Sequence, residues 1–137
     1  MAMRWTAAVA VFVSGLVHLW LWWYDGFRDI PWIGPLFLLN FVAGAVIAVL
    51  LVVWRSWIPP LVAVGFGAST LGCFLLSATV GFLGVHEVLV GTWQITAGIA
   101  EIVAIVAGVA ILLREWSARG SAGEPQDRIA LRRSHLD

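Results

Sequence analysis

Four long apolar stretches alternate with short polar segments along the chain. They cover residues 4–23, 32–53, 61–82 and 91–113, and each is long enough to cross a hydrocarbon core about 30 Å thick as a helix. Because the connecting segments are short, consecutive helices should run antiparallel and lie next to each other. The pattern predicts an all-α fold, an integral membrane up-down four-helix bundle formed by residues 1–113.

Composition agrees with this pattern. Hydrophobic residues make up 61% of the chain and charged residues 12%, and the mean hydropathy is +0.96. These values are typical of a protein whose main partner is the lipid bilayer, and nothing in the sequence indicates nucleic-acid binding. The first stretch is too long for a signal peptide and ends in Trp22, Trp23 and Tyr24 with no small-residue cleavage site. We therefore expect it to be retained.

Charge is distributed unevenly between the two ends of the predicted helices. Only Arg28 falls on one side, and seven arginines share the side that holds both termini. Positive charge favours the cytoplasmic side of a membrane, so both termini should be cytoplasmic in a multi-pass protein of the cell membrane. Residues 114–137 are polar and rich in Ser and Gly, and we expect a mobile cytoplasmic tail there. The seven arginines are Arg4, Arg55, Arg114, Arg119, Arg128, Arg132 and Arg133.

Glu101 stands in the middle of the fourth apolar stretch. A charged group at this depth costs about 2.5 to 3.5 kcal/mol, so it should face the protein interior and marks a candidate functional site. No Arg or Lys falls inside any predicted span. We therefore expect Glu101 to be protonated at neutral pH and to donate to Asn40 or to an oxygen of the third helix. The polar residues that complete this predicted midplane site are Ser14, Asn40, Thr70, Cys73 and Gln94.

Small residues recur at every fourth position of the third stretch. Such spacing is typical of a face against which another membrane helix packs closely, so we expect the third helix to be the most tightly packed. The stripe consists of Gly65, Ser69, Cys73, Ser77 and Gly81. Separately, Trp32 and Asn40 have the same eight-residue spacing as Trp93 and Glu101. This correspondence suggests a duplicated helical hairpin.

Ligand-type side chains gather at the predicted outer rim. His18, His86, Glu87 and Asp25 come from three segments, and such residues can bind zinc, copper or haem iron. The spacing is not diagnostic, because a zinc-protease motif would require a histidine at position 90, which is Val. Two readings stay open: a haem or transition-metal site, or interfacial histidines bonded to backbone or water.

Three segments resemble a known class of proteins. HLWLW at 18–22, IPWIGPLFLLN at 30–40 and GVHE at 84–87 are similar to segments of small four-span integral membrane proteins of unknown function from high-GC Gram-positive bacteria. The resemblance covers the four spans and excludes the tail. It implies no activity and assigns no functional residue.

Three functions are compatible with this sequence. We favour an accessory or scaffold subunit that pairs with other membrane subunits or with copies of itself. The first alternative is a small transporter or channel coupled to protons or cations through Glu101. The second is a haem-binding or metal-binding redox module that uses His18 and His86. No set of catalytic residues stands out, and an enzyme is not expected.

Overall fold

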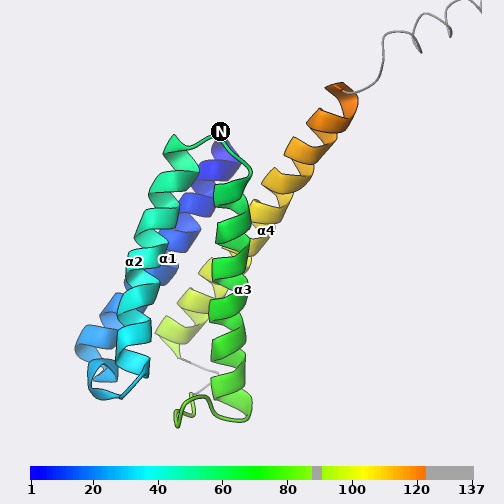
Figure 1. Cartoon of the computed structure of the whole chain (residues 1–137). Helices are drawn as coiled ribbons and strands as arrows, with labels where there is room; N and C mark the ends of the chain where they lie inside the picture. Colours follow the sequence, from blue (N-terminus) through cyan, green and yellow to red (C-terminus); the bar gives the residue numbers. More distant parts are fainter. Residues whose placement is uncertain (88–90, 123–137) are drawn as a thin grey trace, which may run out of the picture.

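The computed structural model describes residues 1–87 and 91–122. Its elements are α1 (Ala2–Tyr24), the 3-10 helix η1 (Phe27–Asp29), α2 (Ile33–Val53), α3 (Ile58–Thr79) and α4 (Thr92–Ala122). The four α-helices alternate in direction, and Met1 lies at the same end as the C-terminal end of α4 (Figure 1). All four are long and apolar enough to cross a membrane. The predicted all-α four-helix membrane fold is confirmed.

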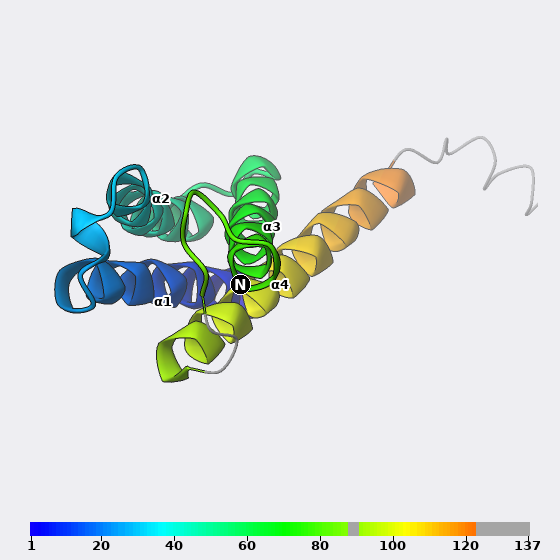
Figure 2. The ribbon, with the colours of Figure 1, turned by 90° about the horizontal axis from the view of Figure 1, so that it is seen from below.

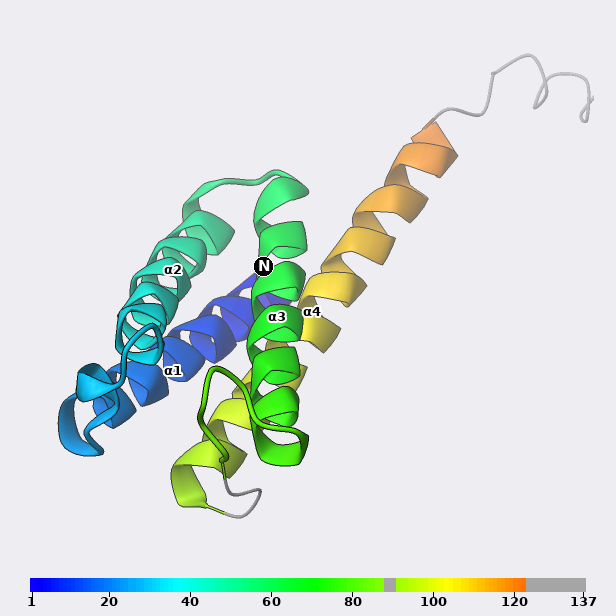
Figure 3. The same ribbon diagram turned by 60° about the horizontal axis from the view of Figure 1, so that its bottom comes forward.

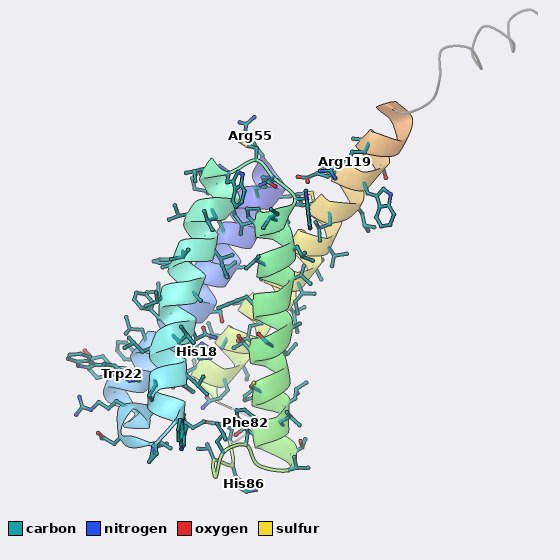
Figure 4. All side chains as sticks on the ribbon, viewed as in Figure 1. His18, Trp22, Arg55, Phe82, His86 and Arg119 are labelled. Carbon is teal, nitrogen blue, oxygen red and sulfur yellow. The ribbon has the colours of Figure 1, made fainter. Side chains whose placement is uncertain are left out.

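The two ends of the bundle differ in what they contain. One end, which we call the arginine end, holds Met1, Arg55 and Arg119 (Figure 4). The other end, which we call the loop end, holds η1 and the loop of residues 80–87. Figure 3 shows this loop folded back beside α3. There, Phe82 and Val85 form an isolated β-bridge, and the Ser77 hydroxyl donates to the Val85 carbonyl at 3.0 Å.

The helices do not all pack with their neighbours in sequence. Helix α1 packs against both α2 and α4, and α3 packs mainly against α4, whereas α2 and α3 touch little (Figure 2). Two glycines, one on α2 and one on α3, allow these close helix contacts. A Cβ on Gly44 of α2 would lie 2.9 Å from the Val11 carbonyl of α1, and one on Gly67 of α3 would lie 2.9 Å from the Glu101 carbonyl of α4. Close backbone approach is therefore built into those two interfaces.

The small-residue stripe of α3 does not have the predicted role. Apart from its chain neighbours and the nearby backbone of α3 itself, no described atom lies within 4 Å of a Cβ placed on Gly65, and Ser69 and Cys73 are exposed. Gly81 lies beyond the end of α3 and has a left-handed φ of 87°. The most tightly packed helix is α1, with 44% of its apolar window buried against 17% for α3. The prediction that α3 packs most closely is wrong, because its contact face is the one that carries Gly67.

Buried apolar side chains concentrate toward the arginine end. All four helices contribute to one cluster, which includes Val11, Ile47, Leu51, Phe66 and Ala104. A second and smaller cluster near the loop end consists of Val17, Leu21 and Ala97, with Phe27 and Phe37 packed against it. The bundle is therefore solidly filled in one half and less so in the other.

Arg4 joins α1, α2 and α4 at the arginine end. Its guanidinium lies 2.6 Å from Glu115 Oε1 of α4, and it donates to the carbonyls of Ser56 at 2.7 Å and Trp54 at 3.0 Å. Helix α4 reaches this partner because it continues past the predicted end of the fourth span at residue 113. Residues 114–122 are helical, so the predicted tail begins as a continuation of α4, and its mobility stays a prediction. Residues 123–137, with Arg128, Arg132 and Arg133, lie outside the described residues.

Candidate functional site

A cavity of about 390 Å³ lies between the helices in the loop-end half of the bundle. All four helices, η1 and the loop of residues 80–87 contribute to its wall. The wall is mainly apolar, as is typical of a small-molecule site. Five of the seven Phe residues of the chain line it, namely Phe27, Phe37, Phe66, Phe74 and Phe82. Its polar lining residues are His18, Asn40, Ser69, Thr70, Cys73, Ser77, Glu87, Gln94 and Glu101.

Glu101 is the most buried polar residue of this wall, with 1% of its surface exposed. The hydroxyl of Ser14, on α1, donates to Glu101 Oε1 at 3.1 Å. The prediction that Glu101 bonds Asn40 or α3 is therefore wrong, because α1 rather than α2 or α3 presents a polar group to it. The other carboxyl oxygen, Oε2, makes no hydrogen bond with the residues that the structure describes. Glu101 therefore has bonding capacity left for a molecule in the cavity.

Asn40 and Thr70 form a second polar pair, across the gap between α2 and α3. The Thr70 hydroxyl gives its proton to the Phe66 carbonyl at 2.8 Å, so toward Asn40 it can only accept. The Asn40 Nδ2 group must therefore face Thr70, and the two atoms lie 2.9 Å apart. This orientation leaves Asn40 Oδ1 buried and without a partner among residues 1–87 and 91–122. A buried unpaired amide oxygen is costly and needs a donor from elsewhere.

His18 lies on the cavity wall with its ring against Phe37, at a centroid distance of 4.9 Å. Its Nδ1 lies 2.8 Å from the backbone carbonyl of Ser14. A carbonyl oxygen only accepts, so Nδ1 carries a proton, and in a neutral ring Nε2 is an acceptor. The Ser14 side chain is bonded to Glu101 instead. Ser14 and His18 therefore do not form a nucleophile and its base.

The four candidate ligands of the outer rim do not come together. His18 and Glu87 line the cavity, whereas His86 and Asp25 do not. Figure 4 shows His86 at the extreme loop end and His18 inside the bundle. The described part of the chain contains no group of three or more His, Cys, Asp or Glu residues that could hold a metal ion. Binding of a metal or of haem stays a prediction, with no site geometry to carry it.

The remaining members of the predicted midplane site are placed differently. Gln94 and Cys73 both line the cavity, but Gln94 is near the loop end, where its Nε2 donates to Glu87 at 3.3 Å. Cys73 is a free cysteine on the exposed side of α3. The phenylalanines of the cavity wall were not among the predicted site residues, although the spacing of Phe66, Thr70 and Phe74 on one helical face was a signal for them.

Comparisons with known proteins add no family to this description. No known protein family, no curated protein and no solved structure matches the chain. The resemblance noted in the sequence implied four membrane spans. The structure supports this part of it, because it contains four helices that are long and apolar enough to cross a membrane.

Proposed function

We propose that this protein binds a small, largely apolar molecule inside the membrane and exchanges it with the bilayer. The unpaired Asn40 Oδ1 beside the cavity of about 390 Å³ carries the proposal. Pockets that hold small organic molecules have volumes of about 300 to 1,000 Å³ and a few convergent polar groups in an apolar wall. A scaffold subunit needs neither the cavity nor an unpaired buried acceptor. Small-molecule binding, as in the transporter alternative, therefore takes precedence over the scaffold role.

The geometry also favours an access route. Leu36 and Leu39 of α2 line the cavity and are 43% and 61% exposed, and Cys73 lines it on the exposed side of α3. The cavity thus opens between α2 and α3, toward the lipid of a surrounding bilayer. At the other end the apolar cluster of Val11, Leu51 and Ala104 fills the interior. A ligand would enter sideways from the bilayer.

As part of this proposal, the positions of the arginines predict how the bundle is oriented in the membrane. Arg55 and Arg119 lie at the arginine end (Figure 4), and positive charge favours the cytoplasmic side. We therefore place the arginine end in the cytoplasm and the loop end outside. A reporter that works only in the cytoplasm should be active when it is fused to the C-terminus, and a reporter that works only outside the cell should be inactive there. Activity outside would overturn the orientation.

Cys73 offers a direct test of ligand binding, because it is the only cysteine of the chain and lines the cavity. The full chain in lipid nanodiscs is labelled with N-ethylmaleimide with and without indole or 2-phenylethylamine. Either compound, when bound, should cover the thiol and slow the labelling several-fold. The matched control is the double variant Cys73→Ala, Leu76→Cys, since Leu76 is 48% exposed and outside the cavity lining.

Two outcomes decide this test. Slower labelling of Cys73 and unchanged labelling of the position-76 cysteine would support a ligand site in the cavity. Equal rates with and without both compounds, or equal slowing at both positions, would overturn it. Equal slowing would mean that the compounds act on the membrane and not on the protein.

A further inference from the structure

The hydrogen-bonding capacity that is left in the cavity is mainly that of acceptors. The hydroxyl protons of Ser69 and Thr70 go to the Phe66 carbonyl, at 3.0 and 2.8 Å, and that of Ser77 goes to Val85. The atoms of the lining residues without a hydrogen bond among the described residues include Asn40 Oδ1, Glu101 Oε2 and His18 Nε2. A neutral imidazole nitrogen and an amide oxygen both accept, and Glu101 Oε2 accepts once the carboxyl has lost its proton. The molecule that satisfies them must donate.

The charged residues of the cavity lining also indicate which class of ligand can bind. The described lining residues include two carboxyl groups, Glu87 and Glu101, and no Arg or Lys. Arg4 is bonded to Glu115 at the arginine end and is not available to Glu101. The phenylalanine rings of the wall add a favourable surface for a cation, since their faces carry partial negative charge. Both the donor requirement and the charge therefore point to a positively charged ligand.

We infer that the ligand is a protonated primary or secondary amine with an apolar group of a size that fits between the Phe side chains. The inference rests on the proposed function and names its ligand class. The ammonium group would donate to Asn40 Oδ1 and Glu101, and the apolar group would contact Phe37, Phe66 and Phe74. A bare metal ion fits less well, because it requires several ligand atoms at about 2.0 to 2.6 Å, and the described residues form no such group.

Binding has a defined charge balance if Glu101 is protonated in the empty site. The ammonium ion enters, the Glu101 carboxyl loses its proton, and that proton leaves the protein, so the charge of the site does not change. The titratable groups that share the cavity with Glu101 are His18 from α1, Cys73 from α3 and Glu87 from the loop, and α2 contributes none. The exchange should release up to one proton for each amine bound.

The test uses three probes of similar shape on the full chain in lipid nanodiscs: 2-phenylethylammonium, 2-phenylethanol and 3-phenylpropionate. Isothermal titration in two buffers with different ionisation enthalpies gives both the affinity and the number of protons released. We expect the ammonium ion to bind at least about tenfold more tightly than the alcohol, as for a hydrogen bond to a charged group. The carboxylate should not bind, and only the ammonium ion should release a proton.

Variants locate the effect. Glu101→Gln should remove both the proton release and the preference for the ammonium ion, whereas Glu101→Asp should keep the proton release. Asn40→Ala should weaken ammonium binding several-fold and leave proton release intact. This variant still tests the inference if Glu101→Gln does not fold. Asp29→Asn is the matched control, because Asp29 is an exposed carboxylate in an ion pair with Arg28, outside the cavity. It should change neither quantity.

Failure of this inference is distinguishable from failure of the proposed function. Equal binding of the alcohol and the ammonium ion, or unchanged proton release in Glu101→Gln, would overturn the amine class and leave a cavity that binds neutral molecules. Absence of binding by all three probes, together with unchanged labelling of Cys73, would overturn the ligand site itself.

Discussion

The α1–α4 interface and the α2–α3 interface both contain a hydrogen bond between polar side chains at the level of the cavity. At the first, Ser14 and Glu101 are 0% and 1% exposed, and contacts continue in both directions, to Arg4 and Glu115 at one end and to Trp20 and Trp93 at the other. At the second, Asn40 and Thr70 are only half-buried and line a space of about 390 Å³. The polar pair is thus part of a closely packed interface between α1 and α4, whereas between α2 and α3 the polar pair forms part of a cavity wall.

Small side chains account for this difference. Helix α4 buries Ala97, Ala100, Ala104 and Ala107, an alanine at every third or fourth residue, and such a face permits close approach of a neighbouring helix. On the facing sides of α2 and α3, the lining residues Leu36, Phe37, Phe66 and Phe74 are large. Side chains of this size do not permit the close approach that alanine permits. What a polar pair does therefore depends on the apolar residues around it.

The unequal interfaces also bear on the suggested duplication of a helical hairpin. Asn40 and Glu101, which correspond in the two halves, line the same cavity. A symmetric pair of hairpins would, however, make α1–α4 and α2–α3 equivalent, and these interfaces are unequal. The duplication stays a prediction, and any original symmetry is not kept in the packing.

The largest effect should follow from breaking the α1–α4 interface at the arginine end. Arg4→Gln removes the bond to Glu115 and weakens the bonds to two or more carbonyls. Hydrogen bonds of charged groups contribute about 1.5 to 3 kcal/mol, and we expect a loss of about that size in the free energy of unfolding. Denaturation in mixed micelles measures it. Arg55→Gln is the control, since Arg55 is exposed and, among the described residues, bonds only the Met1 sulfur, at 3.7 Å. An equal loss in both variants would contradict the role of Arg4.

A somewhat smaller effect should distinguish two glycines of α3. Gly67→Ala places a methyl group 2.9 Å from the Glu101 carbonyl and from Ile105 Cγ1, and overpacking of this kind costs about 1 to 3 kcal/mol. Gly65→Ala meets no described atom within 4 Å and should be neutral or stabilising, because alanine favours a helix over glycine by about 1 kcal/mol. Thermal unfolding of the two variants compares them. Destabilisation by Gly65→Ala alone would restore the stripe as the packing face.

The two polar pairs can be broken separately. Ser14→Ala leaves a carboxyl oxygen of Glu101 without its partner in a packed seam and should cost about 1 kcal/mol. Thr70→Val removes the acceptor of the Asn40 amide, but that amide borders a cavity large enough for water, which can replace the bond. Its cost should stay below about 0.5 kcal/mol. Unfolding free energies in mixed micelles test this order. The reverse order would show that the α2–α3 pair is the structural one.

The smallest effect on stability should come from Glu101→Gln. The amide keeps an acceptor for the Ser14 hydroxyl, so the variant should lose less than the roughly 0.6 kcal/mol of an average hydrogen bond between membrane helices. Infrared spectroscopy should nevertheless show the loss of a protonated-carboxyl band at pH 7, since no Arg or Lys falls inside any of the four predicted spans. Glu87→Gln, which changes the other carboxyl of the cavity near the loop end, should keep the band. A carboxylate band lost in Glu101→Gln would instead show that Glu101 is ionised.

Three properties could be predicted from the sequence: the number of helices, their lengths to within a few residues at most ends, and the isolation of Glu101 from Arg and Lys. These properties are local, because the apolar length of a segment fixes whether it can span a membrane. The predicted end of the fourth helix was wrong because a helix can continue beyond the apolar stretch. Here Glu115 lies in that extension and bonds Arg4.

Which helices meet and which polar groups pair could not be predicted from the sequence and follows from the packing of the helices. Ser14, Asn40 and Thr70 were all expected near the depth of Glu101, so depth could not select the partner. Selection depends on how far each helix is rotated about its axis and how closely two helices approach, and each residue turns the direction of a side chain by about 100°. Those quantities depend on the fit of Gly67 to α4, of Gly44 to α1 and of the alanines of α4 to its neighbours. The cavity is the space that this fit leaves between α2 and α3.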